Sequence, residues 1–165
     1  MNDIVAQNAE TYACKHQLRL AERLGFGVHG IVYVAENKVN GDKSAIKAHR
    51  SVEPYLRELA VYERLKEAGI SEILGFHVPQ LIRTDEELCV IEMSIVTRPF
   101  VLDFAGAYLG TPPDFPDETW AEWEVEKREQ FGDARWPTVQ AVLGALEALE
   151  IHVVDVSPSN VAFLD

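Results

Sequence analysis

Two groups of residues in the first half of the chain have the types and spacing needed to hold phosphate. Three glycines stand in the pattern Gly25-x-Gly27-x-x-Gly30-x-Val32, and a backbone without side chains can lie close over phosphate groups. A lysine, Lys47, follows within a short apolar run, where a positive charge is unfavourable unless it has an anion to hold. Together these residues predict a site for a nucleotide.

The glycine pattern by itself allows more than one interpretation. A dinucleotide-binding turn needs a strand before it and a helix after it, whereas residues 31–35 are β-branched and indicate a strand. A glycine turn between two strands is the setting of a phosphate-covering hairpin, and an ordinary hairpin turn is the alternative. The dinucleotide interpretation is therefore rejected, and the other two depend on what Lys47 does.

A carboxylate that could pair with Lys47 lies on the helix that follows. A proline suited to the first turn and apolar residues at helical spacing predict a helix over 54–68. Glu58 is preferred as the partner because it sits in mid-helix beside the apolar face, while Glu53 and Glu63 are the competing carboxylates. The alternative is a lysine on an edge strand with its ammonium group in water.

The elements that must position these residues follow from the apolar pattern. Runs typical of strands lie at 16–24, 31–35, 44–48, 79–84 and 88–96. The helix over 54–68 falls between the third and the fourth run. Three strands, one helix and two strands predict an antiparallel sheet that carries a single helix.

The second half of the chain has a more helical pattern. An acidic helix is expected from Asp117 to about Gln130, and a further helix from about Pro137. Residues 151–156 are expected to be extended, with a loop over 157–160. The three tryptophans of this half are interpreted as packing residues rather than as a stacking platform.

These residues and two later segments give the sequence a resemblance to the protein-kinase-like superfamily. The segment Ile91-Glu92-Met93-Ser94 looks like the strand end and hinge that receive adenine in that family. Asp155-Val-Ser-Pro-Ser-Asn160 is similar to its catalytic loop. The glycine turn, the lysine, the helix glutamate, the hinge and the loop occur in the family's order, over roughly residues 20–165.

The resemblance implies an α+β fold of the protein-kinase-like type. It would comprise a five-stranded antiparallel N-lobe with one helix over 1–95, and a truncated, mainly helical C-lobe over 96–165. ATP or a related nucleotide would bind in the cleft between the lobes. The residues implied in nucleotide binding are Gly25, Gly27, Gly30, Val32, Lys47, Ile91 as gatekeeper, and the backbone groups of Glu92 and Ser94.

The resemblance also assigns roles in catalysis. Asp155, in the loop-like segment 152–160, would take or orient the proton of the acceptor hydroxyl, while Lys47 and Glu58 hold the phosphates. Asn160 would bind a Mg²⁺ ion.

The sequence departs from the family pattern around this loop. Val153-Val154 stands where the family has His-Arg or His-Gly, and His152 lies one position too early. Ser157 occupies a position where protein kinases acting on Ser or Thr usually carry Lys.

The largest departure is the metal-binding Asp-Phe-Gly, which should follow Asn160 after two strands. Only five residues follow Asn160, so Asp165 is the candidate for a replacement Mg²⁺ ligand. Asp103-Phe104-Ala105-Gly106 occurs before the loop, in the wrong order to serve. The sequence therefore supports nucleotide binding better than catalysis, since Mg²⁺ neutralises the charge that develops in phosphoryl transfer.

Three functions remain as hypotheses. The chain is expected to be a kinase-like, nucleotide-binding domain with weak phosphotransferase activity through Asp155, or else a catalytically inactive pseudokinase. The third is an interaction module that binds a protein through the acidic segment 114–129, whose other interpretation is a solvated helix face.

Composition excludes other classes of function. The chain carries 15 Lys and Arg against 27 Asp and Glu, which argues against nucleic acid as a partner. No apolar run approaches the roughly 20 residues that cross a bilayer.

Cys14 and Cys89 are interpreted as reduced thiols, and the first residues do not resemble a signal peptide, so a cytoplasmic protein is expected. The histidines at 16, 29, 49 and 77 lack ligand spacing and are interpreted as ordinary surface or structural residues.

Overall fold

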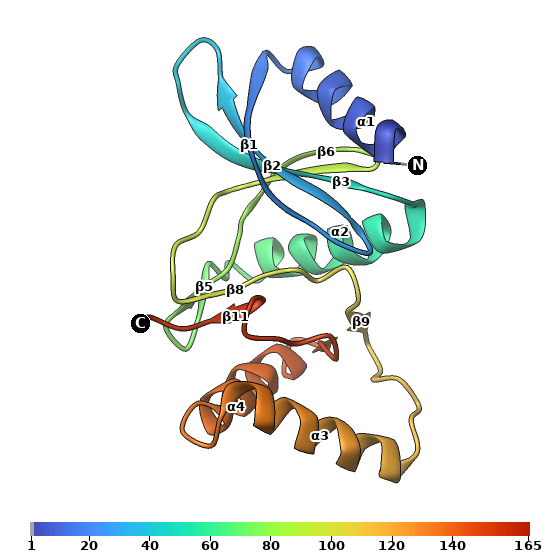
Figure 1. The fold of residues 1–165 in the computed structure, drawn as a ribbon, viewed down its shortest axis with the longest axis vertical. Helices are drawn as coiled ribbons and strands as arrows, with labels where there is room; N and C mark the ends of the chain where they lie inside the picture. The colour runs from blue at the N-terminus through green and yellow to red at the C-terminus, as the bar shows by residue number, and fades with distance from the viewer. Residues whose placement is uncertain (1) are drawn as a thin grey trace.

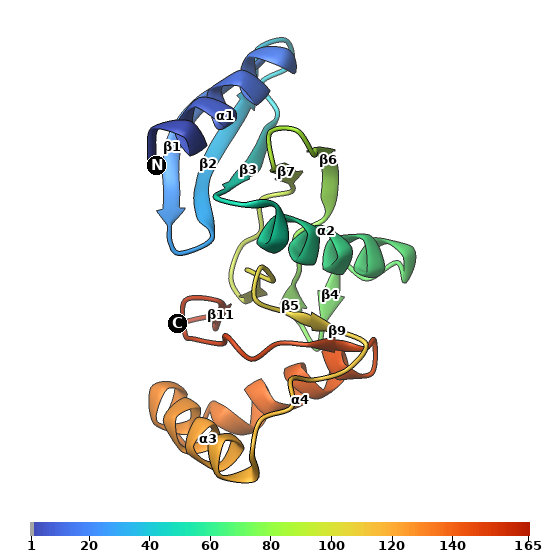
Figure 2. The same ribbon diagram turned by 90° about the vertical axis from the view of Figure 1, so that its right-hand side faces the viewer.

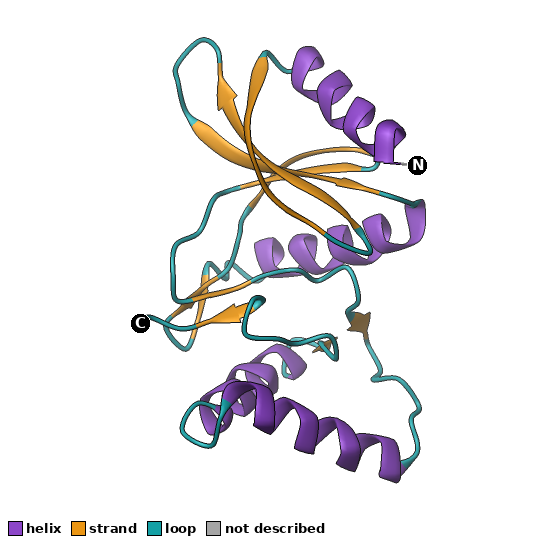
Figure 3. Ribbon diagram, in the orientation of Figure 1, coloured by secondary structure: helices purple, strands orange, loops and turns teal. Residues whose placement is uncertain are grey.

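The computed structural model describes residues 2–165 as an α+β fold of helices and small antiparallel and mixed sheets (Figure 1; Figure 3). Its helices are α1 (Asn2–Lys15), α2 (Val52–Glu67), α3 (Asp117–Phe131) and α4 (Trp136–Glu147). Within the described residues, none of these helices has the length and apolar character needed to cross a membrane. The helices predicted at 54–68, at 117–130 and from 137 correspond to α2, α3 and α4, with small shifts at their ends.

The predicted five-stranded antiparallel sheet is confirmed. Its strands are β1 (Leu18–Phe26), β2 (Gly30–Asn37), β3 (Lys43–His49), β6 (Leu81–Asp85) and β7 (Val90–Met93). They lie in the order β1-β2-β3-β7-β6, and each neighbouring pair is antiparallel. Three of the strands precede α2 in the chain and two follow it. In the strand order, β3 is the central strand, between β2 and β7.

Helices α1 and α2 cover opposite faces of this sheet (Figure 2). Alternate residues of β3 divide between the faces, because Ile46 and Ala48 join the core beneath α1 while Ala45 joins the core on the α2 side. The prediction that 54–68 is the only long helix of the first half is wrong. The helix α1 was missed because its buried stripe includes two alanines, at 9 and 13, among mostly polar residues.

Below α2, short strands from both halves of the chain form a second sheet. The strands are β4 (Glu72–Ile73), β5 (Phe76–His77), β8 (Phe100–Val101) and β11 (Val161–Ala162), in the order β11-β8-β5-β4. β9 (Tyr108–Leu109) and β10 (Ile151–His152) form a separate antiparallel pair. Because β5 pairs with β8, the segments before and after the expected boundary at 95/96 share this sheet.

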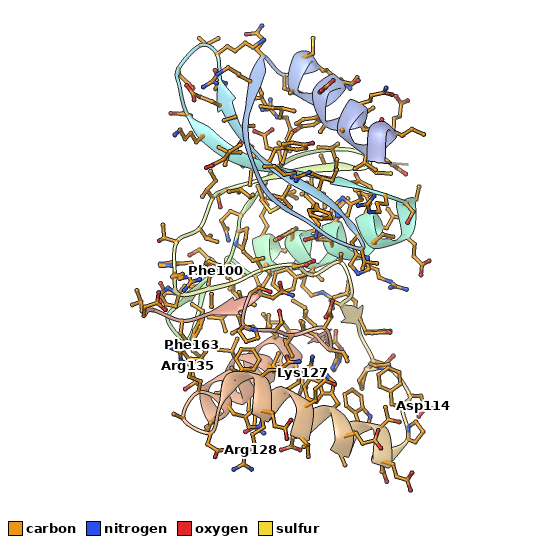
Figure 4. The ribbon with its side chains drawn as sticks, in the orientation of Figure 1. Phe100, Asp114, Lys127, Arg128, Arg135 and Phe163 are labelled. Carbon is orange, nitrogen blue, oxygen red and sulfur yellow. The ribbon has the colours of Figure 1, made fainter. Side chains whose placement is uncertain are left out.

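The last residues of the chain are held by aromatic contacts to both halves. The Phe163 ring meets the Phe76 ring edge-on at 5.1 Å between centroids. The guanidinium of Arg135 lies 4.9 Å from the centre of the Phe163 ring. Figure 4 labels the two residues side by side near the end of the chain. One hydrophobic core also runs through α2, β7, β8, β11 and α4. The strand β11 and the loop before it are thereby fixed against the upper half.

Gly30, at the start of β2, lies close against the backbone of β3, and a substitution there tests how tightly the two strands are packed. A Cβ at this position would lie 2.2 Å from the backbone oxygen of Ala48, so Gly30→Ala forces the strands apart. We expect this change to lower the free energy of unfolding by about 1–3 kcal/mol in urea titrations. Gly144→Ala, in the middle of α4 with open space around it, should instead raise it by about 0.5–1 kcal/mol. Equal effects of the two changes would contradict the packing of Gly30.

Candidate functional site

A cleft of about 860 Å³ lies between the five-stranded sheet and the loops of the lower half. The predicted glycines at 25, 27 and 30 form its roof, together with Val32. Asp155 and Asn160 line the opposite side, and Lys47 and Glu58 lie at its inner end. The structure therefore brings together most of the residues singled out in the sequence.

The predicted ion pair between Lys47 and Glu58 is present. Lys47 Nζ lies 2.8 Å from Glu58 Oε2, and both side chains are buried. The edge-strand alternative for the lysine is wrong, because β3 has neighbours on both sides. Of the competing carboxylates, Glu53 pairs with Arg57 on the helix surface and Glu63 is exposed.

The electrostatics of this pair follow from its burial. Burial alone would raise the pKa of the Glu58 carboxyl, but the charge of Lys47 and the hydrogen bond with His49 outweigh it and hold the pKa at about 2. For the Lys47 ammonium, burial also disfavours the charged form and so lowers the pKa. The charges of Glu58 and Asp103 more than reverse this effect, so the pKa is raised above its usual value. Both groups therefore stay charged at neutral pH inside the protein.

Glu58 has three further donors, none of which the sequence interpretation assigned to it. Tyr62 OH and the backbone N–H of Phe104 each donate to Glu58 Oε1, at 3.4 Å. His49 Nε2 lies 2.7 Å from Glu58 Oε2, and its Nδ1 lies 3.1 Å from the Cys89 backbone oxygen. His49 is a structural residue, as one of the two interpretations had it, but it belongs to the cluster around the Lys47–Glu58 pair, which was not predicted. Its spacing of two from Lys47, which puts both on one strand face, was the available signal.

The lysine also binds a second carboxylate, which belongs to the segment rejected because of its order in the chain. Asp103 Oδ1 accepts a hydrogen bond from Lys47 Nζ at 2.9 Å, and its side chain is one-third exposed to the cleft. The next residue, Phe104, is buried with its ring edge-on to Tyr62, 5.6 Å between centroids. Chain order does not keep this segment out of the site.

The pairing of β8 with β11 explains why Asp103 reaches the cleft. Val101 lies opposite Val161, and the backbone N–H of Leu102 donates to the Asn160 oxygen at 2.9 Å. Asp103 and Asn160 therefore emerge at the same end of the strand pair. Asn160 Nδ2 donates to the backbone oxygen of Asp155 at 3.3 Å, which leaves its carboxamide oxygen for another partner.

The same pairing corrects the expectation for Asp165. Because β11 is antiparallel to β8, the chain after Asn160 runs away from the cleft toward the residues that precede β8. Asp165 therefore lies beside Arg98, at 3.3 Å, with its side chain 87% exposed. It does not line the cleft and is not placed to bind a metal ion there.

The expected adenine-binding positions also need correction. Ile91 is fully buried and lies opposite Lys47 on β3, and Met93 rather than Ile91 lines the cleft. The side chain of Glu92 points to the other face of the sheet, where Tyr12 and Arg83 donate to it. The backbone of Glu92 is held between β3 and β6 in the sheet, and neither Glu92 nor Ile91 lines the cleft.

Ser94 does line the cleft, but part of its backbone is already used. Its N–H donates to the Gln80 oxygen at 2.9 Å, and its Oγ accepts from the Gln80 N–H at 2.8 Å. The next residues along the cleft, Ile95 and Val96, lie beyond the end of β7. The residues that line this wall of the cleft, 93–96, therefore lie about two positions later in the chain than the expected hinge, 91–94.

The acidic segment 114–129 lies on and before α3, away from the cleft. All seven of its acidic side chains are exposed, as expected of a solvated helix face. Protein binding through this segment stays a prediction.

No match was found when the chain was compared with protein-family models, with curated proteins and with solved structures. Within residues 2–165, no group of three or more His, Cys, Asp and Glu side chains gathers as a metal centre. What the cleft can do therefore follows from the geometry of Lys47, Glu58, Asp103, Asp155 and Asn160.

The lowered pKa of Glu58 predicts a pH-dependent contribution to stability. A carboxyl whose pKa falls from 4.5 to about 2 on folding stabilises the protein above pH 5, by on the order of 3 kcal/mol, and this contribution disappears as the pH falls toward 2. Urea unfolding of Glu58→Gln should show a loss of about this size at pH 7 that shrinks between pH 5 and pH 3.

The control is Glu53→Gln, which removes an exposed carboxylate from the same helix. It should change the free energy of unfolding by less than about 1 kcal/mol at either pH. A deficit of Glu58→Gln that stays constant from pH 7 to pH 3 would contradict the buried ion pair.

Proposed function

We propose that the protein binds ATP or a related nucleotide with Mg²⁺ in this cleft, and that it is a protein-kinase-like phosphotransferase whose metal-binding aspartate is Asp103. One observation carries the proposal. The buried Lys47 binds both Glu58 and Asp103 in a cleft that the glycine turn covers and that Asp155 and Asn160 border.

The upper part of the cleft has the chemistry of a nucleotide site. The volume of the whole cleft lies within the usual range of small-molecule pockets. Val32, Ala45 and Met93 supply apolar walls for a base, and the glycine turn supplies backbone close to where phosphates would lie. Lys47, oriented by Glu58, is the cation that would hold the phosphates.

The lower part of the cleft fits Mg²⁺. This ion prefers oxygen ligands and is usually held by one or two carboxylates together with substrate phosphates, so a larger acidic cluster is not required. Asp103 offers a carboxylate that is partly exposed to the cleft, and Asn160 offers the carboxamide oxygen left over from its bond to Asp155. When bound, Mg²⁺ neutralises charge that develops on the phosphates.

Asp155 is the group that would act on the acceptor. Asp155 is exposed and lines the cleft, so a hydroxyl could approach it, and its backbone oxygen is held by Asn160. It would accept or orient the hydroxyl proton, which is the usual part of the aspartate in this chemistry.

The reversed chain order is compatible with this function. In the resembling family the metal-binding aspartate follows the catalytic loop, whereas here Asp103 precedes Asp155 by 52 positions. Catalysis depends on where the groups lie rather than on their order in the chain. The pairing of β8 with β11 supplies that proximity.

A pseudokinase is the second candidate function. The loop offers no cation where protein kinases usually carry lysine, because Ser157 stands there and its Oγ lies 2.8 Å from Ser159 Oγ. A cleft of this kind could bind nucleotide without turning it over.

The metal assignment predicts a selective loss in Asp103→Asn. Calorimetric titration of ADP, with and without Mg²⁺, should show that Mg²⁺ tightens binding to the wild type at least about ten-fold, a difference of about 1.4 kcal/mol. In Asp103→Asn this enhancement should disappear, because a neutral amide is a weaker Mg²⁺ ligand. Asp165→Asn, at the exposed aspartate near the end of the chain, is the matched control and should behave as the wild type does.

No nucleotide binding by the wild type would overturn the proposed function. An equal loss of the Mg²⁺ effect in Asp165→Asn would overturn the choice of Asp103.

Replacing Asp155 distinguishes an enzyme from a pseudokinase. Asp155→Asn keeps the size of the side chain and removes most of its basicity, so Mg²⁺-dependent ADP release should fall about 100-fold or more while nucleotide affinity changes little. Release of ADP can be followed with a coupled assay. Undetectable release by the wild type, with nucleotide bound, would favour the pseudokinase. Turnover that survives the substitution would place the chemistry elsewhere.

A further inference from the structure

His29, which the sequence interpretation treated as an ordinary surface or structural residue, lines the cleft from the glycine turn. The structure places it opposite Gly106, the last residue of the Asp103 segment. A Cβ built on Gly106 would lie 3.9 Å from His29 Nε2 and 3.6 Å from Asp155 Cβ. The space over Gly106 is therefore bordered by the imidazole on one side and by Asp155 on the other.

The turn that carries His29 is anchored to the end of β3. The backbone N–H of Arg50 donates to the His29 oxygen at 2.9 Å, and Arg50 Nε donates to the Gly27 oxygen at 3.0 Å. Within the turn, the N–H of Gly27 donates to the Gly30 oxygen at 2.9 Å. The backbone of the turn that carries the imidazole is thus held in place by the protein itself.

The His29 ring has no hydrogen-bond partner among the described residues. Three other histidines have one: His49 contacts Glu58, His77 contacts the Thr97 oxygen, and His152 contacts the Gly110 oxygen. A polar ring that is partly buried, lines a cleft and has no partner among the described residues is available to a ligand.

The charges around this space show what the ring could bind. Lys47 is already shared between Glu58 and Asp103, and Ser157 supplies no positive charge on the loop side. The third phosphate of a nucleotide adds negative charge at the end of the chain of phosphates, farthest from the base. It needs a donor near Asp155, and His29 is the polar side chain that the glycine turn directs there.

We propose that His29 Nε2 donates a hydrogen bond to the terminal phosphate of a nucleoside triphosphate and makes the cleft prefer triphosphate over diphosphate. This inference rests on the proposed function, because it needs a nucleotide with its base in the upper cleft.

Calorimetric titration with Mg²⁺ tests this, using ADP and a non-hydrolysable ATP analogue. The wild type should bind the triphosphate at least about ten-fold more tightly than ADP, since a hydrogen bond to a charged group has roughly this effect. His29→Leu keeps the bulk of the ring but removes the donor. It should weaken triphosphate binding about ten-fold and leave ADP binding within about two-fold.

Two further variants separate the donor from the shape of the turn. His29→Gln retains an N–H donor and should restore part of the preference for triphosphate. Val28→Ala changes the neighbouring residue, whose side chain is 85% exposed, and should keep the full preference.

The outcomes distinguish the inference from the function on which it rests. Failure of the wild type to bind either nucleotide overturns the proposed function. If both nucleotides bind, an equal loss of their affinities in His29→Leu, or an unchanged preference, overturns the role of His29 and leaves the nucleotide site in place. A preference that disappears equally in Val28→Ala also overturns it, because the shape of the turn would then be responsible.

Discussion

The buried carboxylate of Glu58 is the constraint on which the rest of the site depends. A charge with almost no access to water must be matched by donors, and a lone buried charge is strongly destabilising. The donors come from three parts of the chain: Lys47 and His49 from β3, Tyr62 from α2 itself, and the backbone of Phe104. Satisfying Glu58 therefore fixes α2 against the sheet and holds the 103–106 segment beneath it. The same contacts leave Lys47 and Asp103 facing the cleft together.

The second determinant is the short pairing of β8 with β11. It joins the segment that ends in Asp103 to the segment that begins at Asn160, although α3 and α4 lie between them in the chain. Val101 of β8 and Val161 of β11 pack in the same hydrophobic core as α2. This shared core holds the lower wall of the cleft in a fixed position relative to the upper wall. This arrangement supplies a carboxylate, a carboxamide oxygen and Asp155 around one space. Oxygen ligands of this kind suit Mg²⁺, an ion that is commonly held between carboxylates and the phosphates of a nucleotide, and this is what supports the proposed nucleotide site.

Local patterns in the sequence predicted the features that depend on local physics. Alternation and turn residues predicted the five-stranded sheet, and helical spacing identified α2 and with it the partner of Lys47. The contribution of Asp103 could not be predicted in this way, because it depends on pairing between strands of two residues that lie far apart in sequence. The hinge was expected about two residues too early, because the end of β7 is set by its pairing with β3 and β6, and Met93, on the same face as Ile91, lines the cleft instead. The surroundings of His29 and His49 could not be predicted, because what they face comes from other elements: Glu58 of α2 bonds His49, and Gly106 lies opposite the His29 ring.

The central claim is that Asp103 and Asn160 hold one metal ion with the nucleotide, despite their reversed order in the chain. A double-mutant cycle on the affinity for ADP in the presence of Mg²⁺ tests this most directly, with Asp103→Asn, Asn160→Ala and the combined variant. Two ligands of one ion are coupled, so the combined loss should fall short of the sum of the single losses by about 1 kcal/mol or more. Losses that add to within about 0.5 kcal/mol would show that the two residues act independently and would contradict the claim.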